Sequence, residues 1–356
     1  MASERQRSRC CERLERLGDS TLDREALQLE AIGVLRRVIG FDRWCWPLAD
    51  PETLMPLAGP AQHDYGPQVA RALELEYSGR DFAAMDAVAR RARPVGSLSA
   101  ETRRDLARSP RWDEVLRPVG IGDEAVVAFR DVQGCWGWMK AYRDSEDARF
   151  GEDDLELLAQ VAPMLGAALR RRLEAECGDD VTASSAPGVV VLDEQLRPVS
   201  WTAAVRGWID AFPASAMFAA WGILPPVIYP VAALARSGRG ASGTHALERA
   251  VDGRWVKIEA AVLEGDDAGK TTVTLRRAAP AETFDLLCRA YALTRREREL
   301  VAALRAGLDT RALTERLFIS RHTVQDHLKS VFRKVGVGSR RELLARFGDA
   351  PGELSL

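Results

Sequence analysis

Four side chains in the stretch QDHLKSVFR carry hydrogen-bonding or charged groups at a spacing that could bring them together on one surface. Gln325, Asp326, Lys329 and Arg333 would form a single stripe about three turns long if this stretch were helical. An amide can pair bidentately with adenine, a carboxylate can accept a hydrogen bond from cytosine, and an ammonium group can donate to guanine or to a phosphate. We therefore take Gln325, Asp326 and Lys329 as candidate base-contacting residues.

The ends and flanks of the same stretch carry groups that suit a phosphate backbone. Contacts to phosphate position a protein on a duplex without reading its sequence. The candidates for phosphate contact are Ser320, Arg321, Thr323, Arg333 and Lys334. Two alternatives remain open at this point, because a basic helix face is most often only solvated and a small helical unit can serve protein contacts alone.

The apolar residues of this region predict the helix that would present the stripe. Val324, Leu328, Val331 and Val335 recur at steps of four, three and four, which places them on one buried face of a helix over 321–335. Ser320 can cap its first turn, and a glycine follows its last apolar residue, where a left-handed cap suits glycine.

Three further short helices are predicted around it. Thr294 and Glu297 form a capping box for a helix over 295–305, and Asp309 can cap a second helix. Ser339 can cap the third of these helices. The apolar residues that these three helices would bury are Leu300, Val301, Leu304, Leu313, Leu317, Leu343, Leu344 and Phe347.

Together the segments LTRREREL, GLDTRALTERLFIS and HTVQDHLKSVFRKVGVGSRREL resemble the LuxR-type helix-turn-helix of bacterial transcription regulators, over about 290–347. The resemblance implies double-stranded DNA as a partner, base contacts from the positions singled out above, and contact with RNA polymerase as a further possibility. Ala312, Thr314 and Gln325 depart from the family pattern, which usually has an acidic, a small and a lysine residue there. The third departure means that the usual operator cannot be assumed.

The charge distribution agrees with a DNA-binding segment on an acidic body. From Leu293 to Phe347 there are 13 Lys/Arg and 6 Asp/Glu, so this segment carries +7, and the remainder carries −9 because the whole chain carries −2. No apolar run approaches the ~20 residues that span a bilayer, and the N-terminus lacks a signal core. We expect a cytoplasmic protein without a membrane partner.

The histidines and cysteines do not predict a metal site. His322 and His327 are five residues apart and would point to different sides of a helix. The six cysteines show no ligand spacing and are expected as reduced thiols, although an oxidant-sensing role for the first two stays open; they are Cys10, Cys11, Cys45, Cys135, Cys177 and Cys288.

The first half of the chain, 1–177, predicts a helix over 22–39, a hairpin turning at DVQG, and a long closing helix whose Pro163 would kink it. This layout and the strand GCWGWMKAYR resemble a GAF domain, a fold that senses small ligands. Its clustered aromatic residues either line a ligand pocket or simply fill the core. The candidate pocket residues are Trp44, Trp46, Tyr65, Trp112, Trp136 and Trp138.

The middle segment, 186–279, predicts two strands around a turn, then helices, then a hairpin formed by WVKIEAAVL and KTTVTLRR. This layout resembles a PAS domain. GRGASG at 238–243 matches a dinucleotide-binding pattern but lacks the preceding strand and following helix, so we interpret it as a loop. No other catalytic motif occurs, and neither an enzyme nor a bound cofactor is expected.

The expected fold is therefore multidomain: an α/β GAF-like domain, an α+β PAS-like domain and an all-α four-helix LuxR-type helix-turn-helix domain over 281–356. The expected function is a homodimeric, sequence-specific regulator whose DNA binding responds to an unknown small-molecule effector. Apolar seams on the closing helix and on the 339–347 helix would pair the two copies. The alternatives are a flavin- or haem-binding sensor or enzyme, and an adaptor that binds only proteins.

Overall fold

The computed structural model describes residues 3–62, 65–176, 186–212, 218, 222–239 and 244–347. Within it the chain divides into two compact units, one formed by residues 1–169 and 181–277 and the other by residues 170–180 and 278–356. Residues 177–185, which include Cys177, and the last four residues of the GRGASG segment lie outside the described residues.

The first lobe of the larger unit is built on a four-stranded antiparallel sheet in the order β1-β4-β3-β2. Its two long strands form the predicted hairpin, in which Asp131 of β3 pairs with Gly134 of β4 across the DVQG turn. The strands are β1 (Arg43–Cys45), β2 (Val95–Ser97), β3 (Ile121–Asp131) and β4 (Gly134–Asp144).

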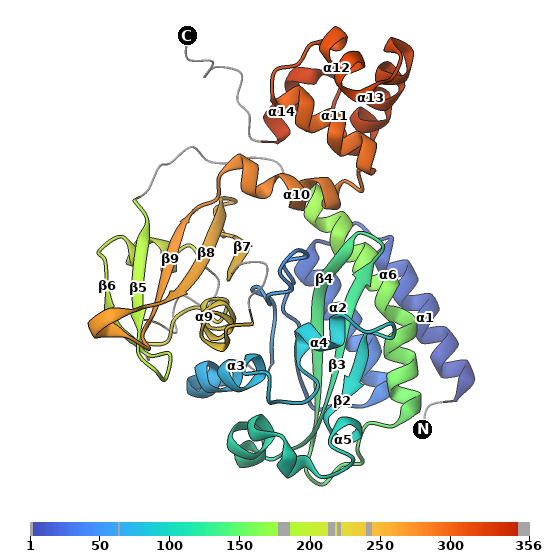
Figure 1. The fold of residues 1–356 in the computed structure, drawn as a ribbon. Helices are drawn as coiled ribbons and strands as arrows, with labels where there is room; N and C mark the ends of the chain where they lie inside the picture. Colours follow the sequence, from blue (N-terminus) through green and yellow to red (C-terminus); the bar gives the residue numbers. More distant parts are fainter. Residues whose placement is uncertain are drawn as a thin grey trace. The chain divides into compact units, whose positions relative to one another are not determined.

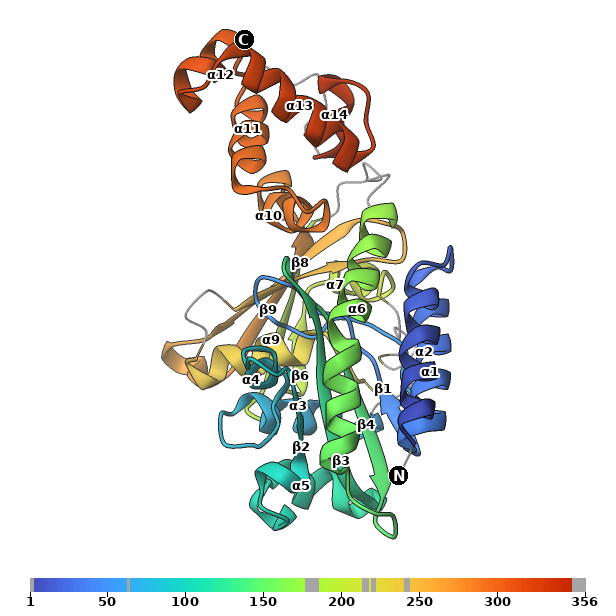
Figure 2. The ribbon, with the colours of Figure 1, turned by 90° about the vertical axis from the view of Figure 1, so that its right-hand side faces the viewer.

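Helices cover both faces of this sheet. Figures 1 and 2 show α6 and the α1–α2 pair on one side, whereas α3 and α4 lie on the other. The helix α6 approaches β3 closely because Gly166 has no side chain, and a Cβ there would stand 2.7 Å from backbone atoms of Arg130. The helices are α1 (Glu4–Gly18), α2 (Arg24–Ile39), α3 (Val69–Tyr77), α4 (Met85–Ala89), α5 (Leu98–Glu101) and α6 (Glu152–Glu176).

Short helical turns connect these elements in the loops that flank α3 and precede β3. Trp112 begins one of them, and its indole nitrogen donates to the carbonyl oxygen of Ile121 at 3.0 Å, which ties this loop to the start of β3. The turns are η1 (Gly66–Gln68), η2 (Leu106–Arg108), η3 (Trp112–Leu116) and η4 (Arg117–Val119).

The second lobe is a five-stranded antiparallel sheet in the order β6-β5-β9-β8-β7 (Figure 1). The predicted strand pairs β5–β6 and β8–β9 are confirmed, and β7 is an additional strand that the sequence did not predict. Its elements are β5 (Gly188–Leu192), β6 (Pro198–Trp201), α7 (Val205–Ile209), α9 (Ile228–Ser237), β7 (His245–Arg249), β8 (Trp255–Val262), η5 (Gly265–Asp267) and β9 (Thr271–Arg277).

The two lobes of this unit share one apolar core. The helix α9 packs on β8 and β9 and also against α3 of the first lobe, and a single cluster of buried residues continues through both. Two buried carboxylates cross between the lobes: Asp50 accepts from the Leu247 N–H at 2.9 Å, and Glu248 accepts from the Ala58 N–H at 2.7 Å. The predicted domain boundaries inside this unit stay predictions.

The smaller unit is helical. The four helices predicted from capping boxes and apolar spacing are confirmed, with α13 covering the predicted 321–335. One more helix, which we did not predict, precedes them. The helices are α10 (Pro280–Ala290), α11 (Arg295–Arg305), α12 (Thr310–Leu317), α13 (Arg321–Val335) and α14 (Arg340–Arg346).

Candidate nucleic-acid interface

The helix α13 is held from behind by its apolar face. Val324, Leu328, Val331 and Val335 are buried, and α13 packs against both α11 and α12. Burying such side chains contributes roughly 1.5–3 kcal/mol each relative to leaving them exposed. The orientation of α13 within its unit is therefore fixed by packing, which leaves its opposite face available.

Both ends of α13 are capped as expected. The hydroxyl oxygen of Ser320 accepts from the backbone N–H of Thr323 at 3.1 Å, and the two hydroxyl oxygens lie 2.9 Å apart. Gly336 ends the helix in a left-handed conformation with φ of 72°, which costs glycine little. Ser320 and Thr323 thus stabilise the N-terminus of α13. The backbone N–H groups at a helix N-terminus also favour binding of an anion.

The predicted base-contacting residues lie on the free face. Gln325, Asp326 and Lys329 are all exposed. Arg333 continues the same stripe one turn further along and is exposed too. Arg321 is exposed at the first turn, so the described part of α13 offers cationic groups at both ends of this stripe.

Asp326 has a histidine neighbour on the exposed surface of α13. The Nδ1 atom of His322 lies 3.7 Å from an Asp326 carboxylate oxygen, one turn away on the exposed surface. Such a pair is solvated and weak, so it leaves the carboxylate able to accept a hydrogen bond from another partner.

Lys334, one of the predicted phosphate-contacting residues, is held by contacts within the smaller unit. Its ammonium group lies 2.6 Å from a carboxylate oxygen of Glu297 and donates to the carbonyl oxygen of Ala292 at 3.1 Å. The sequence did not reveal this, because the ion pair joins α13 to the start of α11 across 37 residues. Lys334 therefore supports the packing of α13 rather than its exposed stripe.

Glu297 is the centre of this internal network. It closes the capping box with Thr294 and accepts from the hydroxyl of Ser330 at 2.7 Å as well as from Lys334. Burial alone would raise the pKa of Glu297, but the hydrogen bonds from Lys334, Thr294 and Ser330 outweigh it and lower the pKa to about 2. The carboxylate is thus charged at neutral pH, and it locks α11 to α13.

The turn between α12 and α13 exposes a residue that the sequence did not single out. Phe318 adopts a left-handed conformation with φ of 54°, and 93% of its surface is accessible. A bulky residue in that conformation is uncommon. The FIS turn was visible in the sequence, but nothing in its spacing indicated that the ring would point away from the core.

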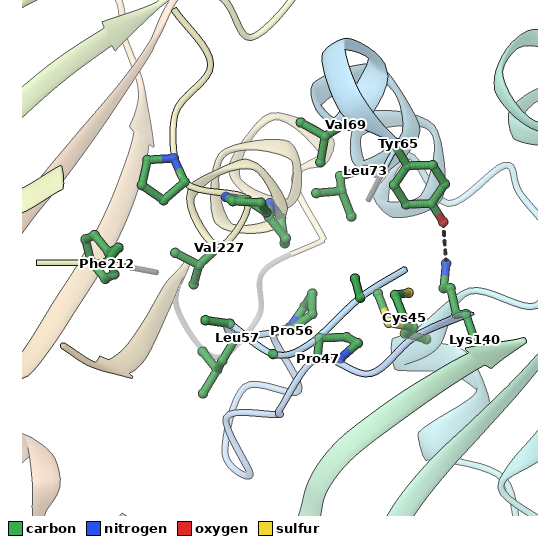
Figure 3. A pocket seen from close by; sticks show the side chains of 17 residues that line it. Cys45, Pro47, Pro56, Leu57, Tyr65, Val69, Leu73, Lys140, Phe212 and Val227 are labelled. Atoms are coloured by element: carbon green, nitrogen blue, oxygen red, sulfur yellow. Dashed lines mark hydrogen bonds between the residues drawn. The ribbon is translucent and has the colours of Figure 1, made fainter. Parts of the chain in front are cut away.

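The six predicted pocket residues all lie in the first lobe of the larger unit, but they do not gather around one described cavity. A cavity of about 270 Å³ lies there, and Tyr65 is the one residue of the predicted six that lines it (Figure 3). Trp46 stacks on Phe129 with ring centroids 4.3 Å apart, and Trp138 is fully buried. Trp44, Trp112 and Trp136 also lie outside this cavity. Four of these indoles are buried in the interior, which was the alternative interpretation, and that of Trp112 is partly buried.

Two findings bear on other kinds of site. Among the described residues, no helix is both long and apolar enough to cross a bilayer. In the same ranges, no group of three or more histidine, cysteine, aspartate or glutamate side chains is arranged to hold a metal ion.

Comparison with known proteins finds relatives of the helical unit. Residues 291–347 match the family described as bacterial regulatory proteins, luxR family. A protein of Aeromonas salmonicida named as an HTH-type transcriptional regulator in the exeN 3′ region is 46% identical over 55 residues, which cover 15% of this chain and 28% of that protein. The regulatory protein SgaR of Hyphomicrobium methylovorum is 47% identical over 53 residues, which cover 15% and 25%.

A third relative matches over a longer stretch. The HTH-type regulator GfsR of Streptomyces halstedii is 29% identical over 108 residues, covering 30% of this chain and 41% of GfsR. The matches thus span less than half of the length of each of these relatives. What the family match and the geometry of α11 to α14 establish is that residues 291–347 are a luxR-family helix-turn-helix domain.

Proposed function

We propose that this chain is a sequence-specific DNA-binding transcription regulator whose helix α13 enters the major groove. The proposal rests on one observation: α13 has a buried apolar face and an exposed polar face. Buried Val324 and Leu328 anchor it, while Gln325 and Lys329 are exposed in a domain of a family of regulatory proteins. In helix-turn-helix proteins the second helix of the motif meets base edges with its outward residues.

The side chains divide into two roles under this proposal. Gln325 pairs with adenine, Asp326 accepts from cytosine, and Lys329 donates to guanine or to a phosphate. Arg321 and Arg333, at the two ends of the stripe, contact phosphates, and Ser320 and Thr323 bring the helix N-terminus to the backbone. Lys334 is left out of this set because Glu297 holds it. From DNA binding we infer a cytoplasmic location for the protein.

The first test removes one charge at a time. With the full chain and a fragment selected from the source organism's genomic DNA, Arg333→Ala should weaken binding on the order of fivefold, and the slope of log affinity against log salt should fall by about one. Lys329→Ala should weaken binding as well. Fluorescence anisotropy at several salt concentrations measures both quantities.

A matched control keeps this test specific. Lys270 is a half-exposed lysine in the larger unit, paired with Asp267, and Lys270→Ala changes the net charge equally. It should leave DNA affinity and salt slope unchanged. If Lys329→Ala and Arg333→Ala bind as tightly as the unaltered chain, α13 does not hold the DNA and the assignment is withdrawn.

We also propose that two copies bind a symmetric operator and that a small molecule on the larger unit shifts their DNA-competent population. The two-fold expectation follows from half-sites one turn apart, ~34 Å. The strand and helix order of the two lobes supports GAF-like and PAS-like sensor modules. Sedimentation with a selected operator should give two chains per site, and one chain per site would contradict pairing.

The two seams from which the sequence predicted pairing are largely buried within the single chain. Leu155, Leu158, Leu165 and Leu169 of α6 are buried within the larger unit. On α14, Leu343 is buried within the smaller one. Both seams are largely used by the fold of each unit, so we do not assign dimerisation to them.

A further inference from the structure

The cavity in the larger unit lies between its two lobes. In Figure 3, Leu57, Val69 and Leu73 of the first lobe face it, and Phe212 and Val227 of the second lobe close it from the other side. Its volume of about 270 Å³ is close to the lower end of the roughly 300–1,000 Å³ typical of ligand sites. It suits a molecule on the order of ten non-hydrogen atoms.

Most of the wall is apolar and stiff. Pro47 and Pro56 line it from the first lobe, and Pro225, Pro226 and Pro230 line it from the second. Proline rings have little conformational freedom, so this wall is largely formed before anything binds. An apolar, pre-shaped wall favours a rigid apolar body.

One end of the cavity is polar. The ammonium group of Lys140 donates to the hydroxyl oxygen of Tyr65 at 3.5 Å, as Figure 3 shows, and both side chains line the cavity. The Tyr65 hydroxyl lies 2.8 Å from that of Tyr142. Lys140 is 1% exposed, so its position is fixed by the protein rather than by solvent.

The charge of Lys140 is already balanced. Its ammonium lies 2.6 Å from Glu76 and 3.7 Å from Glu124. Burial and the nearby Arg111 lower the pKa of Lys140, but these two carboxylates outweigh them and raise it, so the group stays charged. Arg111 in turn pairs with Glu124 and Asp81, both at 2.6 Å.

The buried cluster around Lys140 carries a net negative charge. Two cations, Lys140 and Arg111, face three carboxylates, Glu76, Glu124 and Asp81, which gives −1. Tyr65 adds no charge, because burial raises its pKa to about 12. A carboxylate entering the cavity would be desolvated next to a net negative cluster, which is costly. A neutral hydrogen-bonding group would meet Tyr65 and Lys140 without that cost.

We propose that this cavity binds an uncharged small molecule with a rigid, mostly apolar body and one neutral hydrogen-bonding group, such as a hydroxyl, that contacts Tyr65 and Lys140. The body packs on the prolines and on Val227 and Leu73. Because residues of both lobes line the cavity, such a molecule contacts both lobes at once. The proposal deepens the sensing part of the proposed function and rests on that part alone, since it does not require DNA.

The test uses three probes with one aromatic body. Isothermal titration of the full chain without DNA is performed with 1-naphthol, naphthalene and 1-naphthoate. We expect saturable binding of one 1-naphthol per chain. Naphthalene should bind on the order of fivefold more weakly for want of the hydroxyl, and 1-naphthoate at least about tenfold more weakly for its charge. Naphthoate binding as tightly as naphthol would overturn the proposal.

Two variants locate the site. Tyr65→Phe keeps the Lys140–Glu76 pair and should reduce the preference for naphthol over naphthalene, whereas Leu57→Trp should fill the cavity and abolish binding of both. Leu29→Trp is the matched control on α2, where the leucine is 47% exposed and away from the cavity, and it should bind naphthol normally.

The outcomes separate the two proposals. The cavity assignment is overturned if neither Tyr65→Phe nor Leu57→Trp alters naphthol binding. It is also overturned if a chain that still binds DNA shows no saturable naphthol binding. Both results leave the regulator proposal unaffected. Naphthol binding with these variant effects, in a chain that retains no DNA, supports the cavity and overturns DNA binding.

Discussion

Single residues decide how the exposed stripe of α13 is held in place. Glu297 accepts hydrogen bonds from Thr294, Ser330 and Lys334, and so joins the start of α11 to the middle and end of α13. The sequence predicted its role as a cap but not its ion pair with Lys334, because the spacing of one helix carries no information about a partner 37 residues away. Because of this ion pair, we leave Lys334 out of the proposed phosphate contacts.

The pKa of Glu297 gives a prediction for acid pH. Its folded pKa of about 2 lies below its ordinary 4.5, so its contribution is fully present above about pH 4.5 and is lost as the pH falls toward 2. The loss is on the order of 3 kcal/mol. Hydrogen exchange of α11 and α13 amides should therefore accelerate between pH 5 and pH 3 beyond the intrinsic chemical effect.

Glu297→Gln tests the same point at neutral pH. It should speed exchange in α11 and α13 at pH 7, corresponding to a loss of roughly 2–4 kcal/mol, because Lys334 would lose its buried partner. Glu315→Gln is the control, since the Glu315 pair with Arg311 is exposed and should contribute under about 1 kcal/mol. Equal effects of the two variants would contradict the assigned role of Glu297.

Glu248 predicts the opposite pH dependence for the larger unit. Burial raises its pKa to about 7, and the hydrogen bonds from Ala58 and Arg249 only partly offset this. Because the folded state favours the protonated form, stability is fully present below about pH 4.5 and is lost as the pH rises through 7. Urea unfolding followed by tryptophan fluorescence reports on this unit, since all nine tryptophans precede residue 278.

The variant Glu248→Gln should flatten that dependence between pH 5 and pH 8. The exposed Glu264→Gln should keep the slope of the unaltered chain. A slope that is unchanged in Glu248→Gln would mean that another group titrates across this range.

At the scale of elements, two glycines inside helices of the larger unit make a matched pair. Gly166 of α6 lies against the backbone of Arg130, whereas a Cβ at Gly33 of α2 would meet nothing within 4 Å. Gly33→Ala should stabilise the unit by about 0.5–1 kcal/mol through helix propensity. Gly166→Ala should destabilise it by roughly 1–3 kcal/mol, because α6 must move away from β3.

Urea unfolding of the two variants measures both changes in one assay. The signs should be opposite. A stabilising effect of Gly166→Ala would show that α6 does not depend on close backbone contact with β3.

The elements that the sequence predicted are those with strong local signals. Capping residues and apolar spacing gave the bounds of α13, and alternation gave the β8–β9 hairpin. The strand β7 was missed because the buried Glu248 interrupts its apolar pattern. The carboxylate of Glu248 accepts a hydrogen bond from the Ala58 N–H of the first lobe, a contact that the sequence does not indicate. The helix α10 was missed because its apolar residues follow no cap of the kind that marked α11.

At the scale of the whole chain, long-range packing was what the sequence could not provide. The aromatic residues clustered in the sequence predicted a pocket. In the structure, four of the five indoles are buried in the interior, and the cavity is lined instead by prolines, Tyr65 and Lys140 among others. The exposed stripe of α13 could be predicted because both of its determinants, the buried valines and the polar residues between them, lie within 15 residues.

Substitution of Gln325 shows whether the exposed face of α13 reads DNA bases. Selection of genomic fragments by the full chain, followed by sequencing, should yield a shared motif. Gln325→Ala should keep the motif but lose the preference at one position, with an unchanged salt slope, since an amide that contacts a base does not neutralise phosphate. No enrichment by the unaltered chain, or an identical motif from Gln325→Ala, would contradict the account.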